Sequence, residues 1–146
     1  MDPFSRWKLQ YNRLTSLPES FGELQNLKDC YLYGNQLTEL PESFAQLSNL
    51  HKLSIFRNPL GEFPRQITKL HSLQELYLYD CGISELPEEI GDLQNLRLLY
   101  LQDGQIERVP STIQKLRKLE KLDLSNNALS EEEKHTVRQY FPKKVK

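Results

Sequence analysis

The chain has 146 residues, of which 38% are hydrophobic and 27% are charged, and its formal net charge at pH 7 is -1. This length indicates a single domain, and the balanced charge without a basic run argues against a nucleic-acid partner. The apolar runs are only a few residues long, so we expect neither a membrane-spanning segment nor a membrane partner.

The start of the sequence leaves the localisation open. No apolar signal segment begins at residues 1–4. We expect a secreted or cell-surface protein if a signal peptide has been removed, and a cytoplasmic protein otherwise.

A 23-residue period runs through the chain. Apolar residues recur in one register at positions 9, 32, 55, 78, 101 and 124, and in another at 21, 44, 67, 90 and 113. Proline follows the same period without a slip, at Pro18, Pro41, Pro64, Pro87 and Pro110. Such a period predicts a solenoid, in which each repeat is one supersecondary unit that cannot bury its apolar face alone.

The Leu-x-Leu segment of the repeat alternates inward and outward positions, which predicts a short strand in each unit. The remaining leucines are spaced by three and suit tight turns on the opposite side. The proline stands where a backbone donor can be spared.

Residues 119–129 carry the full pattern Leu-x-x-Leu-x-Leu-x-x-Asn-x-Leu. This pattern resembles the leucine-rich repeat, in its 23-residue Leu-Pro-x-x-Ile-x-x-Leu type, over about residues 5–141. The resemblance implies an α/β solenoid with a parallel β-sheet on the concave face and turns or short helices on the convex face. We expect one leucine-rich repeat domain over 1–146, with repeats at 5–129.

One column of the repeat reads Asn12, Asn35, Asn58, Cys81, Gly104 and Asn127. In the family that the chain resembles, the asparagine side chain satisfies backbone groups of the turn after the strand, which would otherwise stay unpaired. Cys81 is a known type of substitute, whereas Gly104 has no side chain for this role. We expect a local weakness, or a bound water, at the turn near Gly104.

Cys30 and Cys81 are the only cysteines, and Cys30 takes the place of a core leucine. Two repeats separate them, or roughly 10 Å across parallel strands. Because a disulfide needs Cα atoms within about 7 Å, we predict two free, buried thiols that serve as small apolar core residues.

A helical cap is predicted over 130–141. Ser130 followed by Glu133 forms a capping-box pattern, and the acidic run 131–133 suits a helix N-terminus. Pro142 ends the helix, whose apolar face consists of Val137, Tyr140 and Phe141. We expect the basic tail 142–146 to be loose. The cap resembles the ends of small bacterial leucine-rich repeat proteins, notably those of spirochaetes.

The first unit has no comparable cap, and Trp7 and Leu9 already occupy strand positions. Either upstream repeats have been cut away, or Phe4 and Trp7 cover the edge alone. An open strand edge could also template a dimer.

The register assigns six of the seven tyrosines to outward positions along the predicted sheet. Neighbouring strands are about 4.8 Å apart, so the aromatic residues should form one contiguous aromatic sheet. Each can bury on the order of 150–250 Å², and an exposed patch of several hundred Å² usually marks a binding site. The predicted partner-binding residues are Tyr31, Tyr33, Phe56, Arg57, Tyr77, Tyr79, Leu98 and Tyr100. The alternative is that these residues only stabilise the sheet, at about 0.2–1 kcal/mol per cross-strand pair.

The sequence indicates no catalytic, metal or cofactor site. No glycine-rich phosphate loop occurs, and the three histidines, His51, His71 and His135, fall in different parts of the unit. They should not converge on a metal or a nucleophile.

The favoured function is a protein–protein interaction module that binds a partner through the aromatic concave face, without enzymatic activity. One alternative is a recognition fragment of a larger enzyme or signalling protein. Another is a self-associating structural protein. Repeat folds bind many unlike ligands, so the sequence does not name the partner.

Overall fold

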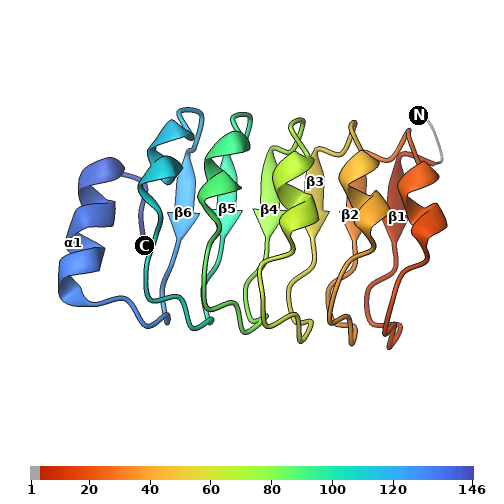
Figure 1. Cartoon of the computed structure of the whole chain (residues 1–146), viewed down its shortest axis with the longest axis horizontal. Coiled ribbons are helices and arrows are strands. Elements are labelled where there is room, and N and C mark those ends of the chain that lie inside the picture. The colour runs from red at the N-terminus through yellow and green to blue at the C-terminus, as the bar shows by residue number, and fades with distance from the viewer. Residues whose placement is uncertain (1–3) are drawn as a thin grey trace.

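The computed structural model describes residues 4–146, which form a single row of stacked repeats (Figure 1). Six three-residue strands make one parallel sheet in sequential order: β1 (Arg6–Lys8), β2 (Asp29–Tyr31), β3 (Lys52–Ser54), β4 (Glu75–Tyr77), β5 (Leu98–Tyr100) and β6 (Lys121–Asp123). Five 3-10 turns lie on the other side: η1 (Glu19–Glu23), η2 (Glu42–Gln46), η3 (Arg65–Lys69), η4 (Glu88–Asp92) and η5 (Ser111–Lys115). Helix α1 (Glu131–Tyr140) closes the C-terminal end.

The strand register confirms the predicted 23-residue period. Trp7 pairs with Cys30, and Leu99 pairs with Leu122. Because every strand pairs with the one a repeat later, each column of the sequence becomes a line of residues across the sheet.

Each 3-10 turn begins directly after one of the period prolines. The Pro18 carbonyl accepts from Phe21 N–H at 2.9 Å, and the Pro41 carbonyl accepts from Phe44 N–H at 2.9 Å. Proline therefore supplies an acceptor and a fixed φ at a position that needs no donor. The residue three places later is buried in every unit: Phe21, Phe44, Ile67, Ile90 and Ile113.

The asparagine column ties neighbouring repeats together. Asn58 Nδ2 donates to Leu32 O at 3.0 Å and Ile55 O at 2.9 Å, and its Oδ1 accepts from Leu37 N–H at 3.0 Å. Asn35 and Asn127 form the same pattern. These bonds satisfy buried turn groups, as the family resemblance implied.

The two repeats that follow Asn58 carry Cys81 and Gly104 in this column instead of asparagine. Cys81 Sγ lies 3.4 Å from Ile55 O, but it offers no oxygen to Leu60 N–H, which bonds to Asn58 O instead at 2.8 Å. Gly104 has no side chain, and a Cβ there would lie 2.7 Å from Asn127 Oδ1. The expected weakness near Gly104 remains a prediction.

Both cysteines are free and buried, as predicted. Burial raises the pKa of the Cys30 thiol well above its usual range and that of Cys81 to about 11. Both thiols therefore stay protonated at neutral pH and behave as apolar core groups.

Helix α1 forms as expected, but only half of the capping box is made. Ser130 Oγ accepts from Glu133 N–H at 3.1 Å. The Glu133 carboxylate, however, accepts from Val109 N–H at 2.9 Å. It thereby joins the helix to the preceding repeat.

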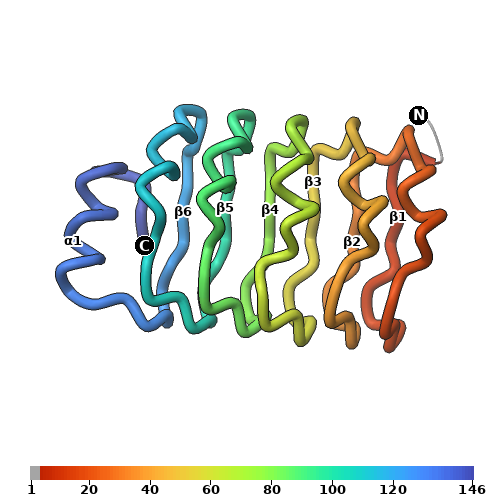
Figure 2. The backbone as a smooth tube through the Cα atoms, viewed as in Figure 1, coloured from red at the N-terminus to blue at the C-terminus, as the bar shows by residue number. Residues whose placement is uncertain are grey.

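The expectation of a loose tail was wrong. Val145 forms a parallel bridge with Leu122, and the tail returns between α1 and β6 (Figure 2). Leu122 N–H donates to Lys144 O at 2.9 Å, and Lys146 N–H donates back to Leu122 O at 2.9 Å. The tail is ordered because the outer edge of β6 offers unpaired backbone groups that an extended segment can satisfy.

Candidate functional site

The predicted aromatic binding residues lie in and just after the strands of the sheet. Tyr31, Tyr77 and Tyr100 are the last residues of β2, β4 and β5. Tyr33, Phe56 and Tyr79 lie two residues beyond the ends of β2, β3 and β4. Because alternate residues of a strand share a face, the two groups run as parallel lines across the repeats.

The first line, which we call the Phe56 row, consists of Tyr11, Tyr33, Phe56 and Tyr79. The Phe56 ring stacks on Tyr33 with 4.3 Å between centroids and on Tyr79 with 4.2 Å. Tyr11 meets the edge of Tyr33 at 5.3 Å. The rings repeat at about the strand spacing, so the row is continuous.

The second line, the Tyr77 row, consists of Tyr31, Tyr77 and Tyr100. Tyr77 stacks on Tyr100 with 5.0 Å between centroids. Ser54 takes the ring position between Tyr31 and Tyr77, and the Lys52 ammonium lies 5.2 Å from the Tyr31 centroid and 5.4 Å from that of Tyr77. The aromatic residues therefore form two rows, one of them interrupted, and the prediction of one contiguous aromatic sheet was too simple.

The six predicted aromatic residues are half-buried. Face-to-face stacking hides a broad side of the five rings other than Tyr31. The exposed apolar area is therefore smaller than the sequence suggested, and the accessible chemistry combines ring edges with tyrosine hydroxyls.

Arg57 and Leu98 complete the predicted set. Arg57 is exposed directly after Phe56, with its guanidinium carbon 5.9 Å from the Phe56 ring centroid and its Nε 3.8 Å from an Asp80 carboxylate oxygen. Its φ is 57°, in the left-handed region, which is strained for a residue of this type. Leu98 is half-buried on β5, where the register places it between Glu75 and Lys121.

Two of the tyrosines have raised pKa values. Burial is the main cause for Tyr77, and the hydrogen bond from its hydroxyl to Glu75 Oε1, at 2.8 Å, raises the pKa further. Burial also raises the pKa of Tyr79, opposed by the positive charge of Arg57. Both hydroxyls thus remain protonated donors at neutral pH.

The sequence analysis left Tyr11 and Lys52 out of the site. The Tyr11 ring occupies space over Gly34, where a Cβ would lie 2.5 Å from the ring. Gly34 lies one repeat after Tyr11 in the same column of the sequence. A glycine at that place leaves room for the ring, and this was the signal that could have predicted the contact. Lys52 was not among the predicted binding residues, yet its ammonium lies between two rings of the Tyr77 row.

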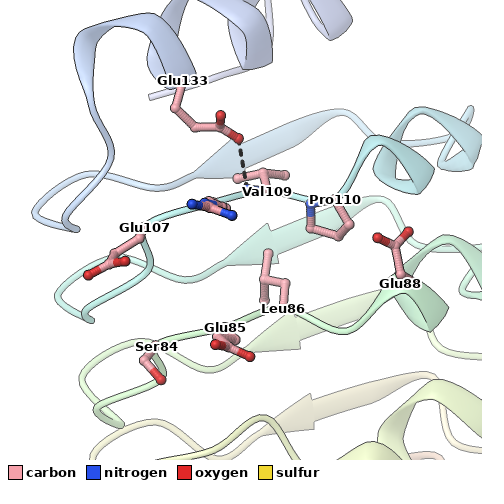
Figure 3. Close-up of a pocket in the computed structure, with 9 residues that line it drawn as sticks. Ser84, Glu85, Leu86, Glu88, Glu107, Val109, Pro110 and Glu133 are labelled. Carbon is pink, nitrogen blue, oxygen red and sulfur yellow. Dashed lines mark hydrogen bonds between the residues drawn. The ribbon is translucent and has the colours of Figure 1, made fainter.

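An acidic cavity of about 750 Å³ lies between the last repeats and α1 (Figure 3). Its lining includes Arg108 and four glutamates: Glu85, Glu88, Glu107 and Glu133. The Glu133 carboxylate accepts a hydrogen bond from Val109 N–H. Within residues 4–146, no three histidine, cysteine or acidic residues are placed to hold a metal ion. The same residues include no helix long and apolar enough to cross a membrane.

Comparisons with known proteins agree with this architecture. One family model, described as a leucine rich repeat, matches residues 8–60, and a second, described as a leucine-rich repeat region, matches 65–133. No curated protein sequence matches the chain.

Several solved structures are similar. Internalin C2 of Listeria monocytogenes is 28% identical with a TM-score of 0.79, over 87% of this chain and 54% of that one. The structure of PEPR1-AtPEP1 is 33% identical with a TM-score of 0.77, over 86% of this chain and 18% of that one. The leucine-rich repeat ectodomain of the receptor kinase GASSHO1/SCHENGEN3 from Arabidopsis thaliana, in complex with CASPARIAN STRIP INTEGRITY FACTOR 2, is 26% identical with a TM-score of 0.68, over 85% of this chain and 18% of that one.

The chain thus spans about half of the internalin C2 structure and less than a fifth of the other two structures. Domains of this fold generally serve in protein interaction. Both family models, the parallel strands and the period prolines agree that the chain belongs to the leucine-rich repeat family.

Proposed function

We propose that this protein is an interaction module without enzymatic activity, which binds a partner protein through the two aromatic rows of its concave face. The observation that carries the proposal is the concentration of stacked rings on one face: Phe56 lies between Tyr33 and Tyr79, and Tyr77 stacks on Tyr100 of the next repeat. Tyrosine and arginine are among the residues enriched at interface hot spots.

Stabilisation of the sheet accounts for part of this arrangement. A stacked aromatic pair contributes about 0.5–1.5 kcal/mol beyond area burial, so the Phe56 row would add stability to any protein. Stability alone gives no reason for the hydroxyls of Tyr33 and Tyr79, because apolar rings would stack equally well. A binding surface needs both the rigid rings and their polar edges.

The similar structures support a protein partner. One of them is a receptor ectodomain in complex with CASPARIAN STRIP INTEGRITY FACTOR 2. The small share of those chains that is covered favours a second candidate, in which this chain is the recognition part of a larger signalling protein.

A comparative pull-down tests the proposal. The bait proteins are the wild type, the double variant Tyr77→Ala/Tyr79→Ala, and a matched control, Lys69→Ala/His71→Ala, on the exposed convex side. Urea unfolding first confirms that all three are folded. We expect a partner that the wild type and the control both recover and that the tyrosine variant loses. Equal recovery by all three baits would reject the concave face as the binding surface.

A further inference from the structure

The Tyr77 row has one vacant ring position. The register aligns Tyr31, Ser54 and Tyr77 on three successive strands. The face-to-face stacked pairs of both rows have ring centroids 4.2–5.0 Å apart. Two strand spacings therefore separate the Tyr31 and Tyr77 rings by roughly 10 Å, which is the room that one intervening ring needs. We call this space, bounded by Tyr31, Ser54 and Tyr77, the Ser54 notch.

Lys52 closes the notch in the unbound protein. Its side chain leaves the strand two residues before Ser54, on the same face, and its ammonium lies 5.2 and 5.4 Å from the two ring centroids. Cation–π contacts at exposed sites contribute only about 0.5–1 kcal/mol each. A ligand with a better partner for the ammonium can therefore move it aside.

The Lys52 ammonium in the Ser54 notch is not neutralised by a carboxylate of residues 4–146. Among the described residues, no carboxylate oxygen lies within ion-pair distance of Lys52, although Asp29 and Glu75 are its neighbours on the adjoining strands. Arg6 holds Asp29 in an ion pair at 3.0 Å. The Tyr77 hydroxyl donates to Glu75 at 2.8 Å.

We propose that the Ser54 notch receives an aromatic side chain of the partner, from an extended segment in which an acidic residue beside the ring pairs with Lys52. This proposal rests on the proposed function of the concave face and names the chemistry of its anchor. The inserted ring completes a continuous stack from Tyr31 to Tyr100, and the partner carboxylate replaces the cation–π contacts of Lys52 with a charge-assisted hydrogen bond.

The shape and the charge together select this occupant. Two flat ring faces with one ring's thickness between them favour an aromatic ring over a branched aliphatic side chain, which cannot stack on both. A guanidinium would also stack, but it would meet the Lys52 ammonium, and like charges repel. The Phe56 row has no such vacancy between Tyr33 and Tyr79, because Phe56 fills it.

Peptide titration followed by ¹H–¹⁵N NMR tests the inference on the full chain. The probe is acetyl-Gly-Asp-Phe-Asp-Gly-amide; one control peptide replaces its phenylalanine with leucine, and another replaces both aspartates with lysine. We expect the probe to shift the amides of Tyr31, Ser54 and Tyr77, and each control peptide to bind about tenfold more weakly, the equivalent of one lost stack or charge pair.

Two variants link the shifts to the notch. Ser54→Tyr fills the vacant position with the protein's own ring and should abolish the shifts, whereas Ser48→Tyr, which adds a tyrosine at an exposed convex position, should leave them unchanged. Lys52→Glu keeps the notch and should reverse the preference between the aspartate and lysine peptides. Backbone spectra of each variant report whether it is folded.

The outcomes separate this inference from the proposed function. Equal binding of the phenylalanine and leucine peptides, or unchanged shifts in Ser54→Tyr, would overturn the notch as an aromatic site. If Ser54→Tyr still recovers the partner in the pull-down while the Tyr77/Tyr79 variant does not, the concave face binds the partner but the notch does not anchor it. If both variants recover the partner, both proposals fail.

Discussion

The two ends of the solenoid are closed to different degrees. At the C-terminal end, α1 and the returning tail cover the last repeat: Leu124 is 4% exposed, Phe141 is 7% exposed, and Val145 pairs with β6. At the other end, no strand among residues 4–146 pairs with the outer edge of β1, and Trp7 is only half-buried against Phe21, with 5.8 Å between ring centroids.

The difference shows what a repeat protein needs at its ends. A terminal repeat exposes both apolar side chains and unpaired strand groups. The C-terminal segment satisfies both needs with separate elements, a helix for the side chains and a strand for the backbone. An aromatic contact such as Trp7–Phe21 addresses only the first.

The largest expected effect comes from one column of the repeat, compared at its two ends. Leu9 and Leu124 occupy the same position, but Leu9 is half-buried and Leu124 is buried. Leu124→Ala should lower the free energy of unfolding by about 3 kcal/mol, because it leaves a closed cavity. Leu9→Ala should lower it by about 1 kcal/mol, since its side chain already meets solvent. Equal losses in urea unfolding would mean that the N-terminal end is as well covered as the C-terminal end.

Removal of residues 144–146 should open the C-terminal edge. The deletion breaks three backbone hydrogen bonds to Leu122 and Leu124, which should lower the free energy of unfolding by about 1–3 kcal/mol. The exposed β6 edge should also promote association, visible in sedimentation velocity.

A matched variant separates the backbone of the tail from its charges. Lys144→Ala/Lys146→Ala keeps the strand pairing, because those bonds use main-chain atoms. This variant should retain wild-type stability and sedimentation. A loss as large as that of the deletion would show that the lysine side chains, and not the strand, close the edge.

A smaller effect is expected at the start of α1. Ser130→Ala removes the oxygen that accepts from Glu133 N–H, and loss of such a cap costs about 1 kcal/mol. Ser111→Ala is a suitable control, because Ser111 is exposed at the start of η5 and uses only its backbone carbonyl in a bond with Gln114. Thermal unfolding of both variants should show a shift for the first alone.

The smallest effect concerns pH at the same cap. The hydrogen bond from Lys134, at 3.0 Å, lowers the pKa of Glu131 below its ordinary 4.5. A carboxylate with a lowered pKa stabilises the folded state above its ordinary pKa, and this contribution disappears as the pH falls through the lowered value. Glu131→Gln should therefore flatten the loss of stability below pH 4.5. An unchanged acid-side slope in unfolding experiments would count against the ion pair.

Much of the site followed from the repeat alone. The period assigned Tyr33, Phe56 and Tyr79 to one column, and the structure stacks these three rings. The period could not show that stacking would half-bury the rings, since ring orientation depends on rotamers and neighbours. Nor could it show that Lys52 would lie between Tyr31 and Tyr77, because a long, flexible side chain has several directions open to it.

The sequence by itself determined the solenoid, its 23-residue register, the buried columns and the face on which the tyrosines lie. It could do so because every repeat meets the same neighbours, so one position in the pattern has one environment throughout. Only the tertiary structure decided the features that occur once: the tail beside β6, the bond from Val109 to Glu133, and the place of the Lys52 ammonium between two rings. The tail and α1 lie outside the repeat, and a long side chain can take several directions, so no repeating signal in the sequence records these contacts.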